Sequence, residues 1–167
     1  MITEMKIARL PDGRTLREPM TSIISFFGAG LLPIAPGTWG SLAAIPFGVL
    51  LAWIGGWQFL LVASVLAYGV GYIATDAYIH ATGRQDPPEV VIDEVATQWM
   101  VMAFVPITFW GLFGAFIVFR IFDTIKPWPA SWADQEVEGG AGVMLDDFIA
   151  GLYSIPPLIA LDIMGFF

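Results

Sequence analysis

The residues best suited to chemistry lie within residues 119–151, which begin FRIFDTIKPWP and end GGAGVMLDDFIAG. Here the adjacent acids Asp146 and Asp147 open an apolar segment, and Asp93 and Glu94 repeat that arrangement earlier in the chain. Mg²⁺ prefers carboxylate ligands, usually together with water and substrate phosphate oxygens. The two acid pairs therefore predict a single magnesium site whose ligands are Asp93, Glu94, Asp146 and Asp147.

Basic residues in the same stretch are suited to binding phosphate. Arg120 and Asp123 are three residues apart, hence on one face of a predicted helix, and Lys126 continues that face before Pro127 ends it. Such a row could be an internal salt bridge. As an active-site row, it assigns phosphate binding to Arg120 as a fork and to Lys126 as a point charge. Asp123 would then be the general base or, alternatively, a covalent nucleophile.

A stretch rich in glycine and proline precedes the first long apolar run. Residues 28–41 read GAGLLPIAPGTWGS, a composition that no regular helix tolerates. Thr38 or Ser41 is predicted to cap the next helix, and its N-terminus, with Gly37, is suited to a phosphate. An ordinary tight turn with a cap is the alternative. Gly140, in a glycine-rich turn predicted before the second acid pair, is assigned to the same substrate site.

Hydropathy places the chain in the membrane class. It is 57% apolar and 13% charged, with a mean hydropathy of +0.74. Residues 21–75 and 95–119 contain no Asp, Glu, Lys or Arg, and each run exceeds the roughly 20 residues of one bilayer crossing. We predict an all-α, multihelical bundle, embedded in or associated with a membrane, with glycine-rich active-site loops. A soluble helical protein with a large core is the alternative.

The elements that must position the site follow from glycine and proline. Helices are predicted over 42–55 and 57–75, and another is predicted to begin at residues 86–88 and to carry Glu89 and Asp93 on one face. Both halves of the site must lie on one side of the membrane. The segment 95–119 between them must then cross an even number of times or not at all, which favours a bent, re-entrant hairpin at Pro106.

Residues 1–20 are predicted to be a flexible cytoplasmic tail, and residues 21–167 a single domain. The tail holds four of the seven cationic residues, which favours the cytoplasmic side. Cysteine is absent, which excludes thiol chemistry, and the single histidine, His80, is predicted to have a surface or capping role. The net charge of −8 argues against nucleic acid as a partner. Formation of a homo-oligomer stays open.

Three blocks, in order, resemble the signature of the phosphatidylglycerophosphatase A family: GAGLLPIAPGTWGSLAAIP, DPPEVVIDE, and FRIFDTIKPWP with GGAGVMLDDFIAG. The resemblance covers about residues 22–155. It implies an all-α fold in the bacterial inner membrane and Mg²⁺-dependent removal of the terminal phosphate from phosphatidylglycerophosphate, giving phosphatidylglycerol. The chain departs from the pattern at Thr97, Gln135 and Ala141. Thr97 is expected to affect helix packing, and the missing cation at position 135 to weaken headgroup binding.

Two functions compete with this one. Acids within a membrane and glycine breaks also suit a non-enzymatic transporter of cations or lipids. A phosphatase on the same fold could instead act on a soluble phosphate monoester. The sequence lacks the patterns of other phosphatases, such as DxDx[TV], and that favours metal-assisted hydrolysis.

Overall fold

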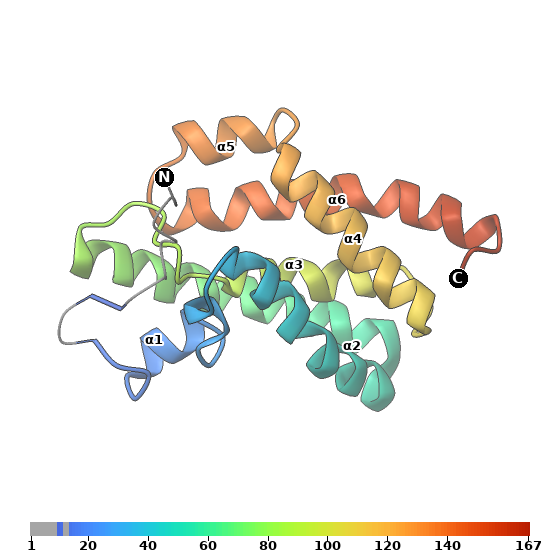
Figure 1. Cartoon of the computed structure of the whole chain (residues 1–167), viewed down its shortest axis with the longest axis horizontal. Helices are drawn as coiled ribbons and strands as arrows, with labels where there is room; N and C mark the ends of the chain where they lie inside the picture. Colours follow the sequence, from blue (N-terminus) through green and yellow to red (C-terminus); the bar gives the residue numbers. More distant parts are fainter. Residues whose placement is uncertain (1–9, 12–13) are drawn as a thin grey trace, which may run out of the picture.

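The computed structural model describes residues 10–11 and 14–167, and all regular structure within them is helical (Figure 1). The predicted all-α class is confirmed. Of the predicted tail, residues 1–9 and 12–13 lie outside the described part, whereas Arg14 already pairs with Glu18 at 2.8 Å. The elements in chain order are α1 (Pro19–Ile24), the 3-10 turn η1 (Ala29–Leu31), α2 (Pro36–Thr82), α3 (Ile92–Met102), α4 (Phe109–Ile125), α5 (Ala130–Glu136) and α6 (Gly139–Ile163).

Helix α2 is a hairpin of two legs, residues 36–54 and 57–82. Gly55 and Gly56 interrupt it with non-helical backbone, and Figure 1 shows that the chain reverses its direction there. Gly56 has φ +67°, a conformation that glycine adopts without the steric penalty of a Cβ. The predicted pair of helices on either side of these glycines is confirmed. Helices α2 and α6 are long and apolar enough to cross a membrane.

Helices α3 and α4 form a second hairpin around Pro106. Helix α3 ends at Met102 and α4 begins at Phe109, where the Thr108 hydroxyl accepts a hydrogen bond of 3.0 Å from the Gly111 amide. The predicted bend is therefore confirmed. Helix α3 has 11 residues and rises about 16 Å, which is too short to cross a bilayer alone. Re-entry of this hairpin into a membrane stays a prediction.

The loop between α2 and α3 corrects one expectation. Gly83, with φ +68°, ends α2 as predicted, but no helix begins at residues 86–88; α3 begins at Ile92 instead. Glu89 and Asp93 therefore do not share a helical face. Glu89 is fully buried in the loop. Tertiary contacts overrode the local proline signal there.

Those contacts involve one carboxylate oxygen of Glu89. It accepts hydrogen bonds from the Tyr78 hydroxyl and the Arg84 guanidinium, each at 2.6 Å. On the other side of the loop, a Cβ at Gly30 would lie 2.2 Å from the Glu89 carbonyl oxygen, so η1 and the loop are in close contact. These contacts hold the loop that leads directly into the acids of α3.

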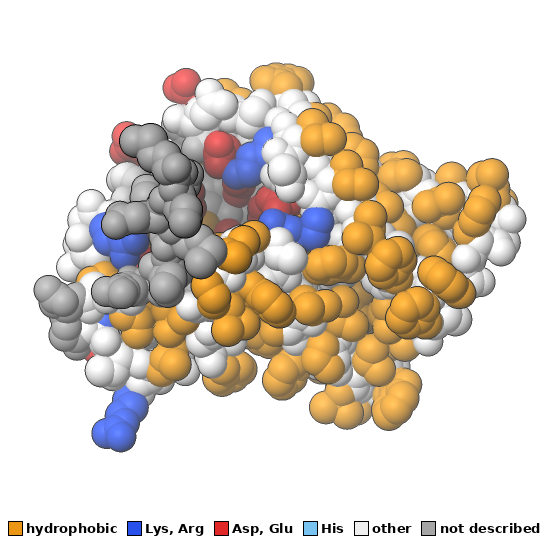
Figure 2. Space-filling view, in the orientation of Figure 1, with side chains coloured by type: hydrophobic (Ala, Val, Ile, Leu, Met, Phe, Trp, Pro, Cys, Tyr) orange, Lys and Arg blue, Asp and Glu red, His pale blue; other side chains and the backbone are white. Residues whose placement is uncertain are grey.

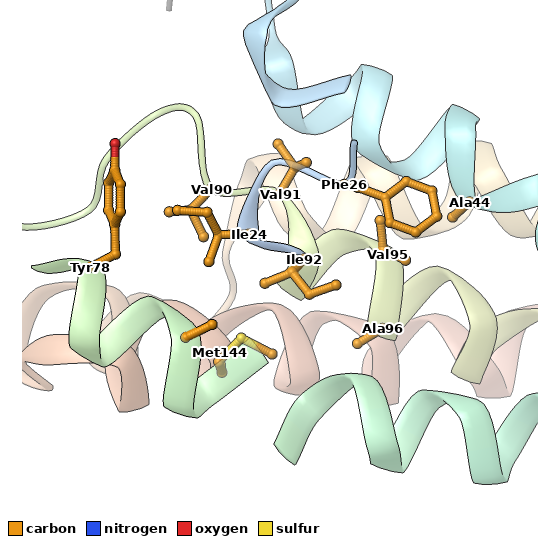
Figure 3. Close-up of a cluster of buried hydrophobic side chains, with 11 residues drawn as sticks. Ile24, Phe26, Ala44, Tyr78, Val90, Val91, Ile92, Val95, Ala96 and Met144 are labelled. Atoms are coloured by element: carbon orange, nitrogen blue, oxygen red, sulfur yellow. The ribbon is translucent and has the colours of Figure 1, made fainter. Parts of the chain in front are cut away.

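A hydrophobic cluster surrounds the start of α3. It joins Ile24 of α1, Ala44 of α2, Val91 of the loop, Val95 of α3 and Met144 of α6 (Figure 3). The Val91 amide also donates a hydrogen bond of 2.8 Å to the Ile24 carbonyl. Segments far apart in the sequence thus pack around the first turn of α3, and this packing positions the acids Asp93 and Glu94.

Candidate active site

Three acidic side chains converge at the contact between α3 and α6. Asp93, Glu94 and Asp147 each offer one oxygen, and these oxygens lie within 4.8 Å of one another. One buried carboxylate oxygen of each residue has no hydrogen-bond partner among the described residues. Buried anionic oxygens normally have partners, and convergent carboxylates are what a hard divalent cation binds. The three residues therefore fit a Mg²⁺ ion.

Glycine in α6 allows this approach. A Cβ at Gly151 would lie 2.5 Å from both the Thr97 methyl and the Met100 methyl, so α6 packs directly on α3. Asp147 lies one helical turn before Gly151 and consequently faces the first turn of α3. The acid trio is thus a product of close helix packing rather than of sequence proximity.

The trio is electrostatically unfavourable without a cation. Burial raises the pKa of Asp93 well above its usual range, and the neighbouring charges of Glu94 and Asp147 raise it further. Burial also raises the pKa of Glu94. A bound cation would relieve both the desolvation and the mutual repulsion of these carboxylates.

Asp146, the fourth predicted ligand, points elsewhere. Its carboxylate pairs with the Lys126 ammonium and also accepts a hydrogen bond of 2.9 Å from the amide of Asp147. Successive residues on a helix are about 100° apart, so two adjacent side chains of α6 rarely reach one point. The structure thus brings three of the four predicted metal ligands together and places Asp146 beside a lysine.

Lys126 has two carboxylate partners, Asp134 of α5 and Asp146 of α6. Burial disfavours its charge, but the two carboxylates outweigh that effect and raise the pKa of Lys126. Lys126 follows the last residue of α4 with φ +46°, so it leaves the helical row that was predicted to continue from Arg120. Its left-handed backbone turns the side chain toward α5 and α6.

Arg120 and Asp123 form the predicted pair on one face of α4. The Arg120 guanidinium lies 2.6 Å from Asp123 and 3.8 Å from Glu94, so it connects α4 to the acid trio. Figure 2 shows acidic and basic side chains together in a hollow of the surface, and hydrophobic side chains border it. A phosphate entering this hollow would meet a guanidinium beside the three acids.

The N-terminus of α2 lies against the same residues. A Cβ on Gly37 would come within 1.8 Å of the Glu94 carboxylate and 3.2 Å of the Arg120 guanidinium. The sequence correctly singled out this glycine-rich segment, but the predicted cap is wrong. Ala35 precedes the helix and no side chain of the described residues caps it, because Pro36 sets the first turn. The buried Ser41 hydroxyl donates to the Gly37 carbonyl at 3.0 Å, and Thr38 lies in the first turn.

Gly140 has a different environment from the one expected. The predicted glycine-rich turn is wrong, since α6 already begins at Gly139. The amide of Gly140 donates to the Asp76 carboxylate at 3.1 Å, and a Cβ here would lie 2.8 Å from the Tyr72 carbonyl. Gly140 therefore packs α6 on α2, and its amide is already used. The repeated glycines of this block allow helices to pack closely.

Comparison with known proteins identifies the family. The model of the family described as Phosphatidylglycerophosphatase A matches residues 22–162. The chain belongs to the phosphatidylglycerophosphatase A family. As a member of this family it is a phosphatase and, with two helices able to span a bilayer, a membrane protein. The transporter alternative is thereby set aside.

Three relatives extend the comparison. Phosphatidylglycerophosphatase A of Escherichia coli is 40% identical over 77% of this chain and 74% of its own length. The protein of the same name from Haemophilus influenzae is 34% identical over 89% of this chain and 91% of its own. A protein of Bacteroides thetaiotaomicron named putative phosphatidylinositol-3-phosphatase is 35% identical over 77% of this chain and 84% of its own. No solved structure matches.

Two polar residues that the sequence did not single out, Tyr68 and Gln98, lie near this candidate site. The Tyr68 hydroxyl and the Thr97 hydroxyl form a hydrogen bond between α2 and α3. Gln98 is fully buried, with neither amide atom partnered among the described residues, one turn after Glu94. Isolated polar residues within an uncharged segment were the available signal. The expected effect of Thr97 on packing is seen in its contact with Gly151.

The remaining predicted positions lie at the surface. His80 is exposed and bonds through its ring to the Asp76 carbonyl at 2.8 Å, which confirms a surface role. Gln135 lines a cleft together with Asp134 and Asp146, next to Lys126. Ala141 lines an apolar groove between α2 and α6. The effect of Gln135 on headgroup binding stays a prediction.

Proposed function

We propose that the chain is a Mg²⁺-dependent lipid phosphatase that hydrolyses phosphatidylglycerophosphate to phosphatidylglycerol and phosphate. The observation that carries this proposal is the buried trio of Asp93, Glu94 and Asp147, with unpartnered oxygens, beside Arg120. An acidic site repels an anionic phosphate unless a cation reverses the local field. The names of two relatives supply the substrate.

The residues around the trio have distinct roles in this proposal. A bound Mg²⁺ would provide Lewis acidity toward the phosphate oxygens and favour an ionised water nucleophile. Arg120 binds the non-bridging oxygens and exchanges its contact with Asp123 for the phosphate. The amide of Gly37, the first that α2 offers after Pro36, would donate to the same oxygens.

Asp123 is the general base of the proposed hydrolysis. It is 7% exposed and beside Arg120, so a freed carboxylate there would accept a proton from the attacking water. The new bond joins that water oxygen to phosphorus, and the bond from phosphorus to the glycerol oxygen breaks. The proton then returns to the departing glycerol oxygen. In the alternative, the Asp123 carboxylate itself attacks phosphorus, the bond from phosphorus to the glycerol oxygen breaks, and that oxygen takes up a proton from solvent. Water then hydrolyses the acyl phosphate, which regenerates the carboxylate and releases phosphate and a proton.

Lys126 orients the substrate rather than activating the nucleophile. Its ammonium is held by Asp134 and Asp146 at one edge of the site. It attracts the anionic headgroup when the phosphate replaces one of these two carboxylates. We propose the bacterial inner membrane as the location, with the site facing the cytoplasm, because Arg14 and Arg17 precede α1 on the side of the site.

Phosphate release from purified protein tests the proposal. Three substrates should be compared, with Mg²⁺ and with excess chelator: phosphatidylglycerophosphate, phosphatidylinositol 3-phosphate and the water-soluble glycerol 3-phosphate. We expect Mg²⁺-dependent release from the first. Preference for the inositol lipid would mean that the substrate is the lipid in the name of the third relative. Preference for glycerol 3-phosphate would mean that the enzyme acts on a soluble phosphate monoester. Undiminished release in chelator would refute the metal dependence.

A further inference from the structure

Tryptophan is distributed in a pattern that the proposed chemistry does not require. Six of the seven tryptophans are between 40% and 79% exposed, although exposed tryptophan is costly in water. The exception, Trp99, is half-buried and donates its indole N–H to the Ala44 carbonyl at 2.8 Å. Tryptophan is enriched where a membrane protein meets the two bilayer–water interfaces. We therefore asked whether the six exposed indoles lie at two levels.

One group of tryptophans surrounds the acid site. Trp39 follows Gly37, which contacts Glu94 and Arg120, and the Trp39 indole donates to the Pro33 carbonyl at 3.1 Å. Trp128 follows Lys126 after one residue, and its carbonyl accepts a hydrogen bond from the Tyr153 hydroxyl. Trp132 belongs to α5, the helix whose Asp134 pairs with Lys126. We call Trp39, Trp128 and Trp132 the near belt.

A second group lies at the opposite end of the helices. Trp53 and Trp57 flank the reversal of α2. Trp110 is the second residue of α4, and its ring packs on Phe109 at a centroid distance of 5.1 Å. Trp57 lines one cleft together with Pro106, so the two hairpin turns adjoin. Figure 1 shows the α2 reversal and the start of α4 at the same end of the molecule. We call Trp53, Trp57 and Trp110 the far belt.

The separation of the belts follows from helix geometry. At 1.5 Å per residue, the first leg of α2 rises about 21 Å from Trp39 to Trp53, and α4 rises about 22 Å from Trp110 to its end at Ile125. The two helices run in opposite directions, and each carries tryptophan at or just beyond both ends. A hydrocarbon core is about 30 Å thick, so the belts match one that is somewhat thinned.

Charge follows the same division. Residues 42–75 and 95–119, which include the far belt, contain no charged residue, whereas all the acids and bases of the site lie next to the near belt. The exposed residues between the belts are large and apolar, including Leu66 at 63% and Ile117 at 38%. Figure 2 shows this apolar surface continuing to the rim of the charged hollow. Only a lipid bilayer fits an apolar band with aromatic borders on both sides.

We infer that the chain spans the bilayer between the two tryptophan belts, with the acid trio at the headgroup level of one leaflet. This inference rests on the proposed function. It means that a phospholipid substrate keeps its acyl chains in the leaflet while its terminal phosphate enters the hollow from the side. The enzyme then need not extract its substrate from the membrane.

The absence of cysteine makes a direct depth measurement possible. Single cysteines carrying a nitroxide would be placed in full-length protein in phosphatidylcholine vesicles, and their accessibility to oxygen and to a water-soluble nickel chelate would be compared. On α2, Leu42→Cys, Leu66→Cys and Ile54→Cys sample the near level, the middle and the far level. On α4, Ile125→Cys, Ile117→Cys and Phe113→Cys sample the same three levels independently, and all six positions are exposed.

We expect the oxygen-to-nickel ratio to be several-fold higher at Leu66→Cys and Ile117→Cys than at either end of both series. Thr124→Cys, beside Asp123 and exposed, should match the near level. A ratio at Ile54→Cys as high as at Leu66→Cys would show insertion into a single leaflet and overturn the inference. So would a ratio at Thr124→Cys equal to that at Ile117→Cys, or nickel access throughout.

Each labelled protein should also be assayed for release of phosphate from phosphatidylglycerophosphate. An active protein with a contrary depth profile refutes the location of the site and leaves the proposed function intact. If the labelled proteins give the expected depth profile but the unmodified protein releases no phosphate, the proposed function is refuted and the location of the site is left intact. The two conclusions therefore fail separately.

Discussion

The two acid pairs are alike in sequence and different in structure. Asp93 and Glu94 both contribute to the trio, whereas Asp146 and Asp147 separate, one to Lys126 and the other to the trio. Both pairs lie within helices, where successive side chains diverge by about 100°. In the first pair the longer Glu94 side chain reaches the same point as Asp93, whereas in the second pair Lys126 holds Asp146 and only Asp147 reaches the trio. Adjacent acids on a helix therefore share a site only where side-chain length and neighbouring charges permit it.

The largest effect on activity is expected from substitution of Asp147, the member of the second pair that reaches the trio. Asp147→Asn should reduce Mg²⁺-dependent phosphate release at least about a thousandfold, since several kcal/mol of charge stabilisation accompany a metal. It should also raise the Mg²⁺ concentration for half activity. Asp162→Asn, an exposed aspartate of the same helix, is the control and should change neither quantity. Unchanged activity in Asp147→Asn would remove the trio from the site.

Gly37→Ala tests the first pair through its neighbour. The new Cβ would lie 1.8 Å from the Glu94 carboxylate and must displace it. A displacement of about 1 Å at a reacting centre can cost on the order of a hundredfold, and we expect that loss in kcat. Gly69→Ala is the matched control, because it adds the same methyl to α2 where no atom of residues 10–11 or 14–167 lies within 4 Å. Equal activity of the two variants would contradict the contact.

Asp146→Asn should have the smaller effect of a residue that acts through another. We expect a loss of about 10- to 100-fold, with the Mg²⁺ concentration for half activity unchanged. Because Asp146 acts through Lys126, the double variant with Lys126→Met should be little worse than the poorer single variant. If Asp146→Asn shifts the Mg²⁺ requirement as Asp147→Asn does, the two residues are equivalent ligands.

The smallest effect concerns stability without metal. Burial and mutual repulsion raise the pKa of Asp93 and Glu94 in the folded chain. The folded state then binds more protons than the unfolded state just above the usual carboxylate range, so stability falls as pH rises. In chelator, the melting temperature should be higher near pH 5.5 than near pH 7.5, and Mg²⁺ should restore it more at about pH 7.5. The opposite trend would mean that other groups already compensate the negative charges of Asp93 and Glu94 in the metal-free protein.

The sequence by itself determined the helical class and the breaks in its helices. Runs without charge required helices, and Gly55-Gly56, Gly83 and Pro106 ended or bent them where predicted, because these residues act through their own backbone. It also singled out three blocks that the fold brings together. Local chemistry of this kind is readable without knowing any contact.

Only the tertiary structure decided how the side chains are grouped. A local signal predicted a helix beginning at residues 86–88, but burial of Glu89 in the loop gave another result. The separation of Asp146 from Asp147 depends on which face of α6 meets α3. That face is set by the contact of Gly151 with Thr97, two residues far apart in sequence. Such contacts leave no local pattern in the sequence from which they could be predicted.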